Sequence, residues 1–117
     1  MTLKMCYDKF GGGYEDVKER FLTDERVAKF LLMFLDDPSF LRLSQALEEN
    51  DLKKAFIEAY TLTGVCFNLG FVKMSKSSGN LAVALKNGSG DNKRLFSEVK
   101  SDYETTIKAI NEWKYQK

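Results

Sequence analysis

The stretch FIEAYTLTGVCFNLGF, residues 56 to 71, decides the fold of this 117-residue chain. Together with the four residues before it, it carries one apolar stripe whose members are spaced alternately three and four residues apart. The stripe consists of Leu52, Ala55, Ala59, Leu62, Cys66 and Leu69, with Phe56 at its edge. This spacing is typical of a helix that buries one side in the core of a helical bundle. We therefore expect a bundle helix over residues 52 to 70.

The opposite side of this helix is also largely apolar, although a solvent-facing side is normally polar. It carries Lys53, Ile57, Tyr60, Gly64, Phe67 and Phe71. Two interpretations are open: the large side chains pack against helices from the start of the chain, or they form an exposed patch that docks a partner. A glycine inside a helix costs about 1 kcal/mol relative to alanine. Gly64, one turn after Tyr60, either leaves room for another molecule to reach that ring or allows two helices to cross closely.

Glycine clusters, one proline and capping residues divide the rest of the chain into further helices. We expect short helices over residues 2 to 10 and 14 to 22, then a helix that Thr23 caps and that runs to about residue 36. Pro38 kinks or restarts this helix, which continues to residue 49. Asp51 caps the central helix, residues 71 to 87 form another, a loop covers residues 87 to 90, and Asp91 caps the last helix. The last helix has its own apolar stripe, formed by Leu95, Val99, Tyr103, Ile107, Ile110 and Trp113.

These segments predict one all-α domain over residues 1 to 117. Four long helices joined by short loops favour an antiparallel up-down four-helix bundle, here with a short N-terminal helical lead-in.

Composition excludes several classes of function. Net charge is +1 with the two signs interleaved along the chain, which argues against a nucleic-acid partner. No apolar run approaches ~18 residues, so we expect no membrane partner. The first residues, MTLKMCYDKF, lack the apolar core of a secretory signal, and we expect a cytoplasmic protein. Cys6 and Cys66 lie in apolar helical contexts and are interpreted as small core residues rather than a redox pair.

The chain contains no histidine. This removes histidine-based acid–base catalysis, the commonest metal ligand and any phosphohistidine. We expect no enzyme activity, no cofactor, no metal site and no small-molecule substrate.

The central stretch resembles the signature of histidine-containing phosphotransfer (HPt) domains, in which AHTLKG is followed by an apolar run and NLG. Here it reads Ala59-Tyr60-Thr61-Leu62-Thr63-Gly64, then Val65-Cys66-Phe67-Asn68-Leu69-Gly70. Residues 30 to 56 are similar to the family's long second helix and the turn into its third. The start MTLKMCYDKFGGGYEDVKERF and the end SEVKSDYETTIKAINEW also resemble HPt domains, so the similarity covers essentially the whole chain.

The resemblance implies a phosphorelay domain of two-component signalling, built as a four-helix bundle. In the family, a histidine on the third helix accepts a phosphoryl group from a receiver domain, a lysine three residues later steadies it, and a glycine four residues later opens access. This chain has Tyr60 at the histidine position and Thr63 at the lysine position, whereas Gly64 remains. A phenol, with a pKa of about 10, is a far poorer nucleophile than an imidazole near pH 7. The departure indicates a pseudo-HPt domain.

Three functions remain open. The favoured one is a protein–protein interaction module that binds a receiver domain of a response regulator or hybrid sensor kinase without relaying phosphate. The expected partner-binding residues are Lys53, Ile57, Tyr60, Thr63, Gly64 and Phe67. A second possibility is a phosphoacceptor role for Tyr60 or Thr63. The third is a structural or homodimerising helical bundle with no signalling role.

Overall fold

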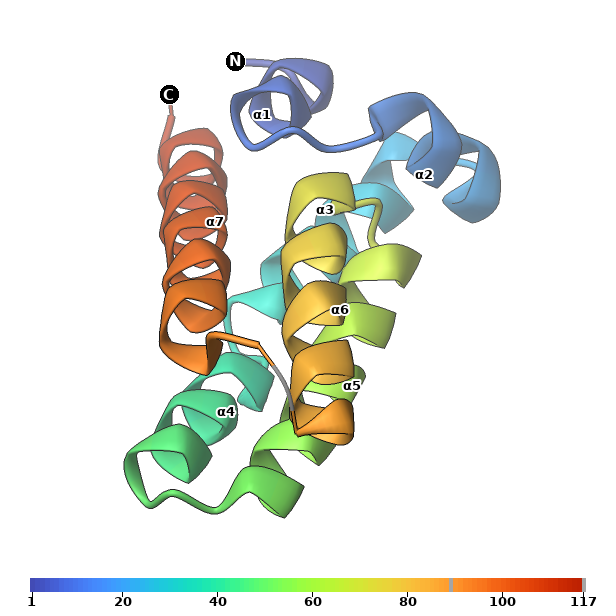
Figure 1. Cartoon of the computed structure of the whole chain (residues 1–117). Helices are drawn as coiled ribbons and strands as arrows, with labels where there is room; N and C mark the ends of the chain where they lie inside the picture. The colour runs from blue at the N-terminus through green and yellow to red at the C-terminus, as the bar shows by residue number, and fades with distance from the viewer. Residues whose placement is uncertain (89, 117) are drawn as a thin grey trace.

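Seven α-helices and the turns between them make up residues 1–88 and 90–116, the part of the chain that the computed structural model describes (Figure 1). The helices are α1 (Leu3–Lys9), α2 (Tyr14–Phe21), α3 (Asp24–Phe34), α4 (Ser39–Glu48), α5 (Leu52–Asn68), α6 (Val72–Asn87) and α7 (Asn92–Lys114). No β-strand occurs in these residues, which confirms the all-α class. Of the expected loop at residues 87 to 90, Ser89 lies outside the described residues.

Side-chain caps fix where four of the helices begin. In each case an oxygen of the residue before the helix accepts a hydrogen bond from a backbone N–H three residues later, which satisfies a donor that the helix itself leaves free. The pairs are Thr2 with Met5, Thr23 with Arg26, Asp51 with Lys54, and Asp91 with Arg94. The predicted caps at Thr23, Asp51 and Asp91 are thus confirmed.

The expected long helix between residues 23 and 49 is two helices. α3 ends at Phe34 and α4 begins at Ser39, so the chain restarts rather than kinks at Pro38. Proline lacks the N–H that a continuous helix would need there. The Asp37 carboxylate accepts a hydrogen bond of 2.9 Å from the Ser39 backbone N–H and supports the new start. The described chain therefore has more and shorter helices than the four long ones expected.

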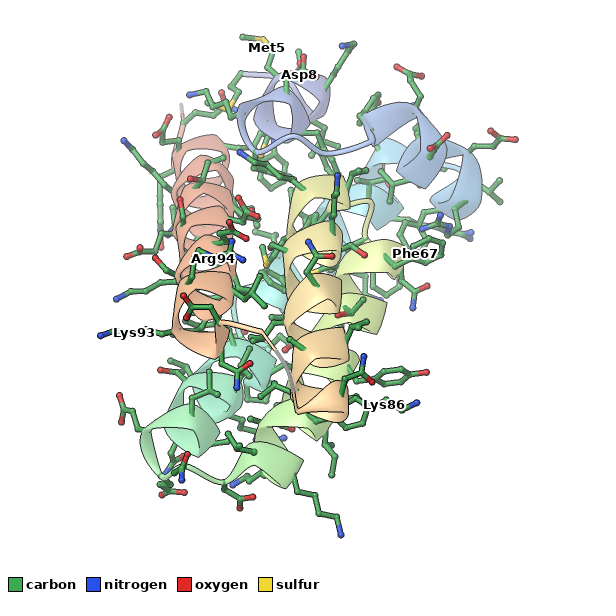
Figure 2. All side chains as sticks on the ribbon, in the orientation of Figure 1. Met5, Asp8, Phe67, Lys86, Lys93 and Arg94 are labelled. Carbon is green, nitrogen blue, oxygen red and sulfur yellow. The ribbon has the colours of Figure 1, made fainter. Side chains whose placement is uncertain are left out.

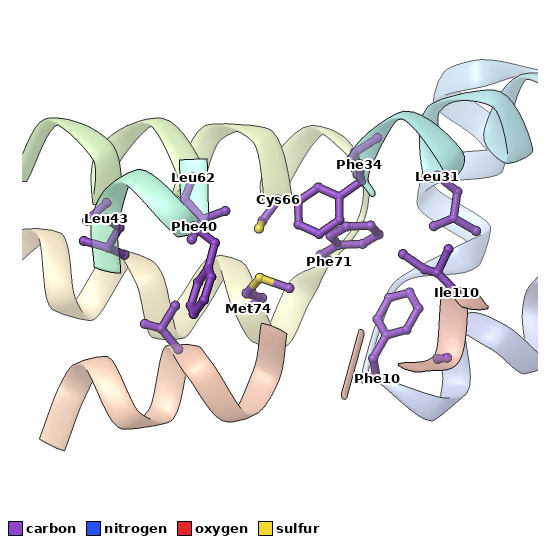
Figure 3. Packing of buried hydrophobic residues seen from close by; sticks show 14 of the residues in the cluster. Phe10, Leu31, Phe34, Phe40, Leu43, Leu62, Cys66, Phe71, Met74 and Ile110 are labelled. Carbon is purple, nitrogen blue, oxygen red and sulfur yellow. The ribbon is translucent and has the colours of Figure 1, made fainter. Parts of the chain in front are cut away.

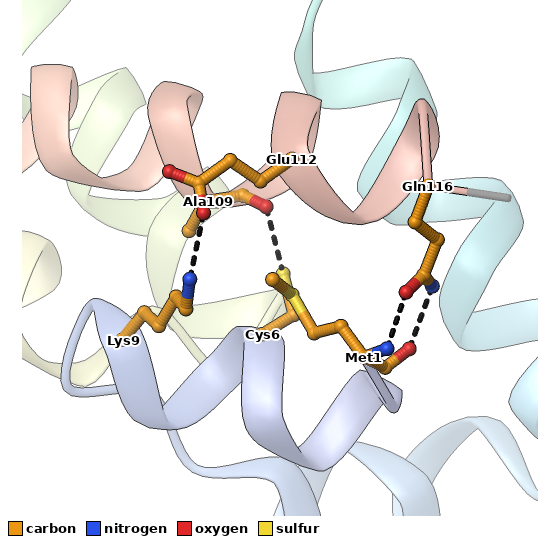
Figure 4. A network of polar contacts seen from close by, with 6 residues as sticks. All are labelled: Met1, Cys6, Lys9, Ala109, Glu112 and Gln116. Carbon is orange, nitrogen blue, oxygen red and sulfur yellow. Dashed lines mark hydrogen bonds and ion pairs between the residues drawn. The ribbon is translucent and has the colours of Figure 1, made fainter.

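Helices that follow one another from α4 onward are also neighbours in space: α4 packs on α5, α5 on α6, and α6 on α7 (Figure 1). The short helix α1 lies against the C-terminal half of α7 (Figure 4). There the Lys9 ammonium lies 2.6 Å from the Glu112 carboxylate, and the Cys6 thiol lies 3.5 Å from the Ala109 carbonyl oxygen. The expected lead-in therefore forms part of the packed structure.

The turn between α5 and α6 is held by the first two helices. The Tyr7 hydroxyl, fully buried, donates a 2.8 Å hydrogen bond to the Leu69 carbonyl. The Gly13 N–H donates one of the same length to the Gly70 carbonyl. Gly70 has φ +74°, and a Cβ there would lie 3.1 Å from the Gly13 carbonyl oxygen, so only glycine fits the turn without strain.

Phe71, directly after this turn, lies in the core. Its ring contacts Phe34 and Phe10 edge-on, with centroids 4.9 and 5.1 Å apart, and Tyr7 at 6.0 Å (Figure 3). The two open interpretations of the second side of α5 therefore divide: Phe71 packs against the N-terminal helices, whereas Phe67, at 66% exposure, lies in solvent. The two side chains would share one side only if the helix continued beyond Asn68, where α5 ends.

The core stripe of α5 is as expected except at its first member. Leu52, the first residue of α5, is 44% exposed because it lies at the end of the packed region. In the α7 stripe, Val99 and Ile110 are buried and the other four members pack half-buried against the core, whereas Thr106 and Ala109 are buried without having been predicted. Cys6 and Cys66 are both buried free thiols, which confirms their interpretation as core residues. None of the described helices is both long and apolar enough to cross a membrane.

The Tyr7 hydroxyl gives a first prediction. Tyr7→Phe removes the donor to the Leu69 carbonyl and leaves that buried acceptor unpaired, which costs about 1–2 kcal/mol of unfolding free energy. Urea denaturation followed by circular dichroism measures this loss. Tyr115→Phe, at a tyrosine that is 70% exposed, is the matched control and should leave stability unchanged. Equal stability of the Tyr7 variant and the control would contradict the inferred role of this hydrogen bond.

Candidate docking face on α5 and α6

The side of α5 that faces away from the core carries large exposed side chains. Ile57 is 51% exposed, Tyr60 is 69% exposed and Phe67 is 66% exposed, and Lys53 lies exposed at the start of the helix. Spacings of four and three residues place these side chains on one stripe. An exposed apolar patch was one of the two interpretations open for this side of the helix. The side is indeed exposed to solvent at Ile57, Tyr60 and Phe67.

Gly64 forms an open notch in this stripe. A Cβ built on it meets no atom within 4 Å apart from its own helix neighbourhood, so no helix crosses close to it. Its alternative interpretation as a close helix crossing is therefore wrong. The notch lies one turn after Tyr60, whose ring is 6.0 Å from that of Phe56. Another molecule can thus approach the Tyr60 ring from the C-terminal side of α5 without meeting a side chain at position 64.

Thr63, also expected at the docking face, turns toward α6. Its hydroxyl donates a 2.8 Å hydrogen bond to the Ala59 carbonyl and lies 3.0 Å from the Ser78 hydroxyl. Its methyl group lies 3.6 Å from the position of a Cβ on Gly79. Because the side chain is part-buried between α5 and α6, its hydroxyl is occupied within the fold and does not reach the open side of Tyr60.

Among the described residues, no side chain is placed to activate the Tyr60 hydroxyl. Within residues 1–88 and 90–116 this hydroxyl has no protein hydrogen-bond partner. Glu58, the one carboxylate of α5, lies about 160° around the helix from Tyr60. One Glu58 oxygen is instead buried without a hydrogen-bond partner. Cys66 does not substitute as a nucleophile, since burial raises the pKa of its thiol well above the usual range.

Arg20 of α2 holds the C-terminal end of the α5 stripe in place. Its guanidinium donates hydrogen bonds to the carbonyls of Phe67 and Asn68, the last residues of α5. The same group lies over the Phe67 ring, 5.6 Å from its centroid. A cavity of about 260 Å³ opens beside Phe67 between α2 and the α5–α6 pair, and Asp16, Arg20, Val72 and Lys76 contribute to its lining. Phe67 is thus exposed and also held in place.

The sequence analysis missed a second stripe, on α6. Its members are Val72, Lys76, Gly79, Val83 and Lys86, again spaced by four and three residues. Val72 is 57% exposed and Val83 is 60% exposed. Gly79 borders Thr63, and Val72 lines the cavity at Phe67, so this stripe adjoins that of α5. The spacing of these residues is visible in the sequence. Val83, however, lies within the apolar run LAVAL, residues 81 to 85, whose other members are buried.

We call the two stripes together the outer face: Lys53, Ile57, Tyr60, Gly64 and Phe67 of α5, with Val72, Lys76, Gly79, Val83 and Lys86 of α6. Phe67 and Lys86 extend from the same side of the molecule in Figure 2. In the described residues, no group of three or more acidic or cysteine side chains is placed to hold a metal ion. The arrangement offers an exposed apolar surface for binding.

No family model, no curated protein and no solved structure matches this chain in the comparisons made.

Proposed function

We propose that this chain is a pseudo-HPt domain that binds receiver domains of response regulators or hybrid sensor kinases through the outer face, without relaying phosphate. The observation that carries the proposal is the pairing of an exposed Tyr60 with an open notch at Gly64. In HPt domains, which the sequence resembles, these are the positions of the phosphoacceptor and of the access glycine. In this proposal α3 with α4, α5, α6 and α7 correspond to the four members of an up-down bundle, and α1 with α2 to its lead-in.

The site has side chains suited to docking a partner but lacks the groups that HPt domains use for phosphoryl transfer. Exposed apolar and aromatic side chains at Ile57, Tyr60 and Phe67 supply the desolvated centre that protein interfaces commonly have. The phosphoryl group, in contrast, would find a phenol in place of an imidazole, and a threonine hydroxyl engaged with Ala59 in place of a lysine ammonium. Loss of that cation removes the electrostatic stabilisation of phosphoryl oxygens. The site is therefore suited to occupy a receiver domain rather than to accept its phosphate.

A charge placed in the apolar centre tests the docking face. Ile57→Lys is expected to weaken binding to receiver domains from the same genome by at least about tenfold, since it buries an unpaired ammonium in the contact. Leu41→Lys, at a leucine of α4 that is 66% exposed, is the matched control and should bind as the wild type does. Calorimetric titration measures both. If no receiver domain binds, or both variants bind alike, the proposal is wrong.

A second copy of this chain is the competing occupant of the same face, because its apolar centre would suit a dimer as well. Light scattering of the wild type and of Ile57→Lys separates the two cases. The proposal expects a monomer in both. A stable wild-type dimer that the substitution dissociates would favour the structural bundle instead.

Restoring the imidazole is expected to restore acceptance of phosphate. The wild type, incubated with a phosphorylated receiver domain, should remain unmodified in mass spectrometry, whereas Tyr60→His should gain one acid-labile phosphoryl group. The reason is that the open notch at Gly64 already admits the partner, and the substitution supplies the missing nucleophile. Tyr115→His, at an equally exposed tyrosine of the last turn, is the control and should stay unmodified. Phosphorylation of the wild type at Tyr60 or Thr63 would contradict this prediction.

A further inference from the structure

The α5–α6 pair is strongly basic, although the chain as a whole is nearly neutral. Residues 52–87 contain five lysines and one acidic residue, Glu58, which gives a net charge of +4. Since the chain has 18 basic and 17 acidic residues in all, the remainder has 13 and 16, a net charge of −3. The two signs are thus not evenly interleaved: the α5–α6 segment is positive and the remainder of the chain is negative.

Three of these lysines belong to the outer face: Lys53 on α5, and Lys76 and Lys86 on α6. All three are exposed, and none of them forms an ion pair with a described residue. Lys73, which lies on another side of α6, instead approaches Asp102 of α7 at 3.8 Å. The cations of the outer face are therefore available to a partner.

Acidic side chains are lacking where the face is apolar. Neither stripe contains an aspartate or glutamate, and Glu58 lies on the far side of α5. At the Phe67 end the face meets α2, where Asp16 lines the cavity together with Arg20 and Lys76, so two cations face one carboxylate. The result is an apolar centre, formed by Ile57, Tyr60, Phe67 and the α6 valines, with a cationic rim.

From this distribution we infer that the outer face binds an acidic protein surface, whose carboxylates lie opposite Lys53, Lys76 and Lys86 while its apolar part covers Tyr60 and fills the notch at Gly64. The inference rests on the proposed function and specifies the chemistry of the receiver-domain surface that fits. Complementary charge at an interface rim mainly accelerates and orients association, whereas the apolar centre supplies most of the affinity.

Two other anionic partners fit these observations less well. A nucleic acid would place its phosphates, which are normally contacted by charged and polar groups, against five exposed apolar side chains. A lipid surface could accept aromatic side chains ringed by lysines, but a flat membrane gives no reason for the open notch at Gly64. A protruding part of a folded partner does give one.

Association kinetics at two ionic strengths test the inference. Raising the salt from about 0.1 M to about 1 M shortens the Debye length from about 10 Å to about 3 Å. The association rate constant of the best-binding receiver domain should fall by about tenfold or more over this range. Lys53→Glu and Lys86→Glu should each lower the rate at low salt several-fold and flatten its salt dependence. Lys93→Glu, at a lysine of α7 that points to the opposite side of the molecule in Figure 2, is the matched control and should behave as the wild type.

The outcomes separate the inference from the function on which it rests. Receiver binding that is lost in Ile57→Lys but is insensitive to salt and to Lys53→Glu and Lys86→Glu overturns the inference alone. Failure of every receiver domain to bind removes the proposed function and the inference with it. Binding to vesicles of phosphatidylserine and phosphatidylcholine that depends on the same lysines, without receiver binding, would identify a lipid-binding face and overturn both.

Discussion

Phe71→Ala is expected to destabilise the fold by about 3–5 kcal/mol, the largest effect on stability predicted here. Phe71 is fully buried, and its ring joins α1, α3 and the α5–α6 turn through contacts with Tyr7, Phe10 and Phe34. Removing it leaves a cavity among three aromatic rings held by α1 and α3, so the site cannot easily collapse. A loss of this size is a large part of the 5–15 kcal/mol that usually stabilises a domain.

Phe67→Ala is the matched control, because the two phenylalanines are only four residues apart in the sequence. Phe67 contacts Arg20 but is 66% exposed, so its removal should cost less than about 1 kcal/mol. The same substitution should weaken receiver binding, since it removes part of the apolar centre of the outer face. Urea denaturation of the two variants measures the difference, and similar losses would contradict the assignment of one ring to the core and the other to the surface.

Gly64→Gln is expected to abolish receiver binding while it makes the folded protein more stable. Glutamine is a good helix former, and a Cβ at position 64 meets no atom within 4 Å, so the helix should gain about 0.5–1 kcal/mol. The same side chain fills the notch beside Tyr60 and should weaken binding by at least about 2 kcal/mol. Opposite effects on stability and binding are characteristic of a glycine kept for access rather than for packing.

Gly64→Ala is the graded control for this substitution. Alanine provides the same helix stabilisation, and its single methyl group fills only part of the notch. We expect its unfolding temperature to rise as in the glutamine variant, with a smaller loss of affinity. A fall in stability for either variant, measured by thermal denaturation, would show that Gly64 packs against something and is not an open notch.

The sequence predicted most of the fold because its signals are local. Caps at Thr23, Asp51 and Asp91 depend on a side chain and a backbone N–H three residues away, and both are visible in the sequence. The apolar stripes of α5 and α7 depend only on helical periodicity. The sequence leaves open whether Pro38 kinks or restarts the helix, because it does not reveal that α3 ends at Phe34 or that Asp37 then accepts a hydrogen bond from the Ser39 N–H.

The sequence does not predict the placement of side chains where that placement depends on tertiary packing. Phe71 shares a side of the helix with Phe67 only if α5 continues, but the turn at Gly70 ends it and directs Phe71 into the core. The family resemblance places Thr63 at the docking face, and only the packed structure shows that its hydroxyl is engaged within the α5–α6 contact. Which side chains of α6 lie beside α5 also depends on packing, so Val83 and Lys86 could not be joined to the site from spacing alone.

The positive charge of the α5–α6 segment could have been predicted from the sequence. The five lysines and single acid of residues 52–87 are plain in the sequence. The net charge of the whole chain does not reveal this excess of lysines, because the negative charge of the other residues nearly cancels it. Only after α5 and α6 are seen to be neighbours does this composition describe one side of the molecule (Figure 1).

The most direct test of the central claim is a titration of the wild type, Gly64→Ala and Gly64→Gln with the receiver domains of the same genome. The account predicts that at least one receiver domain binds the wild type, that alanine weakens this binding slightly, and that glutamine removes it without loss of stability. Receiver binding that Gly64→Gln leaves unchanged, or no binding to any receiver domain, would contradict the claim that Tyr60 and Gly64 form a docking site.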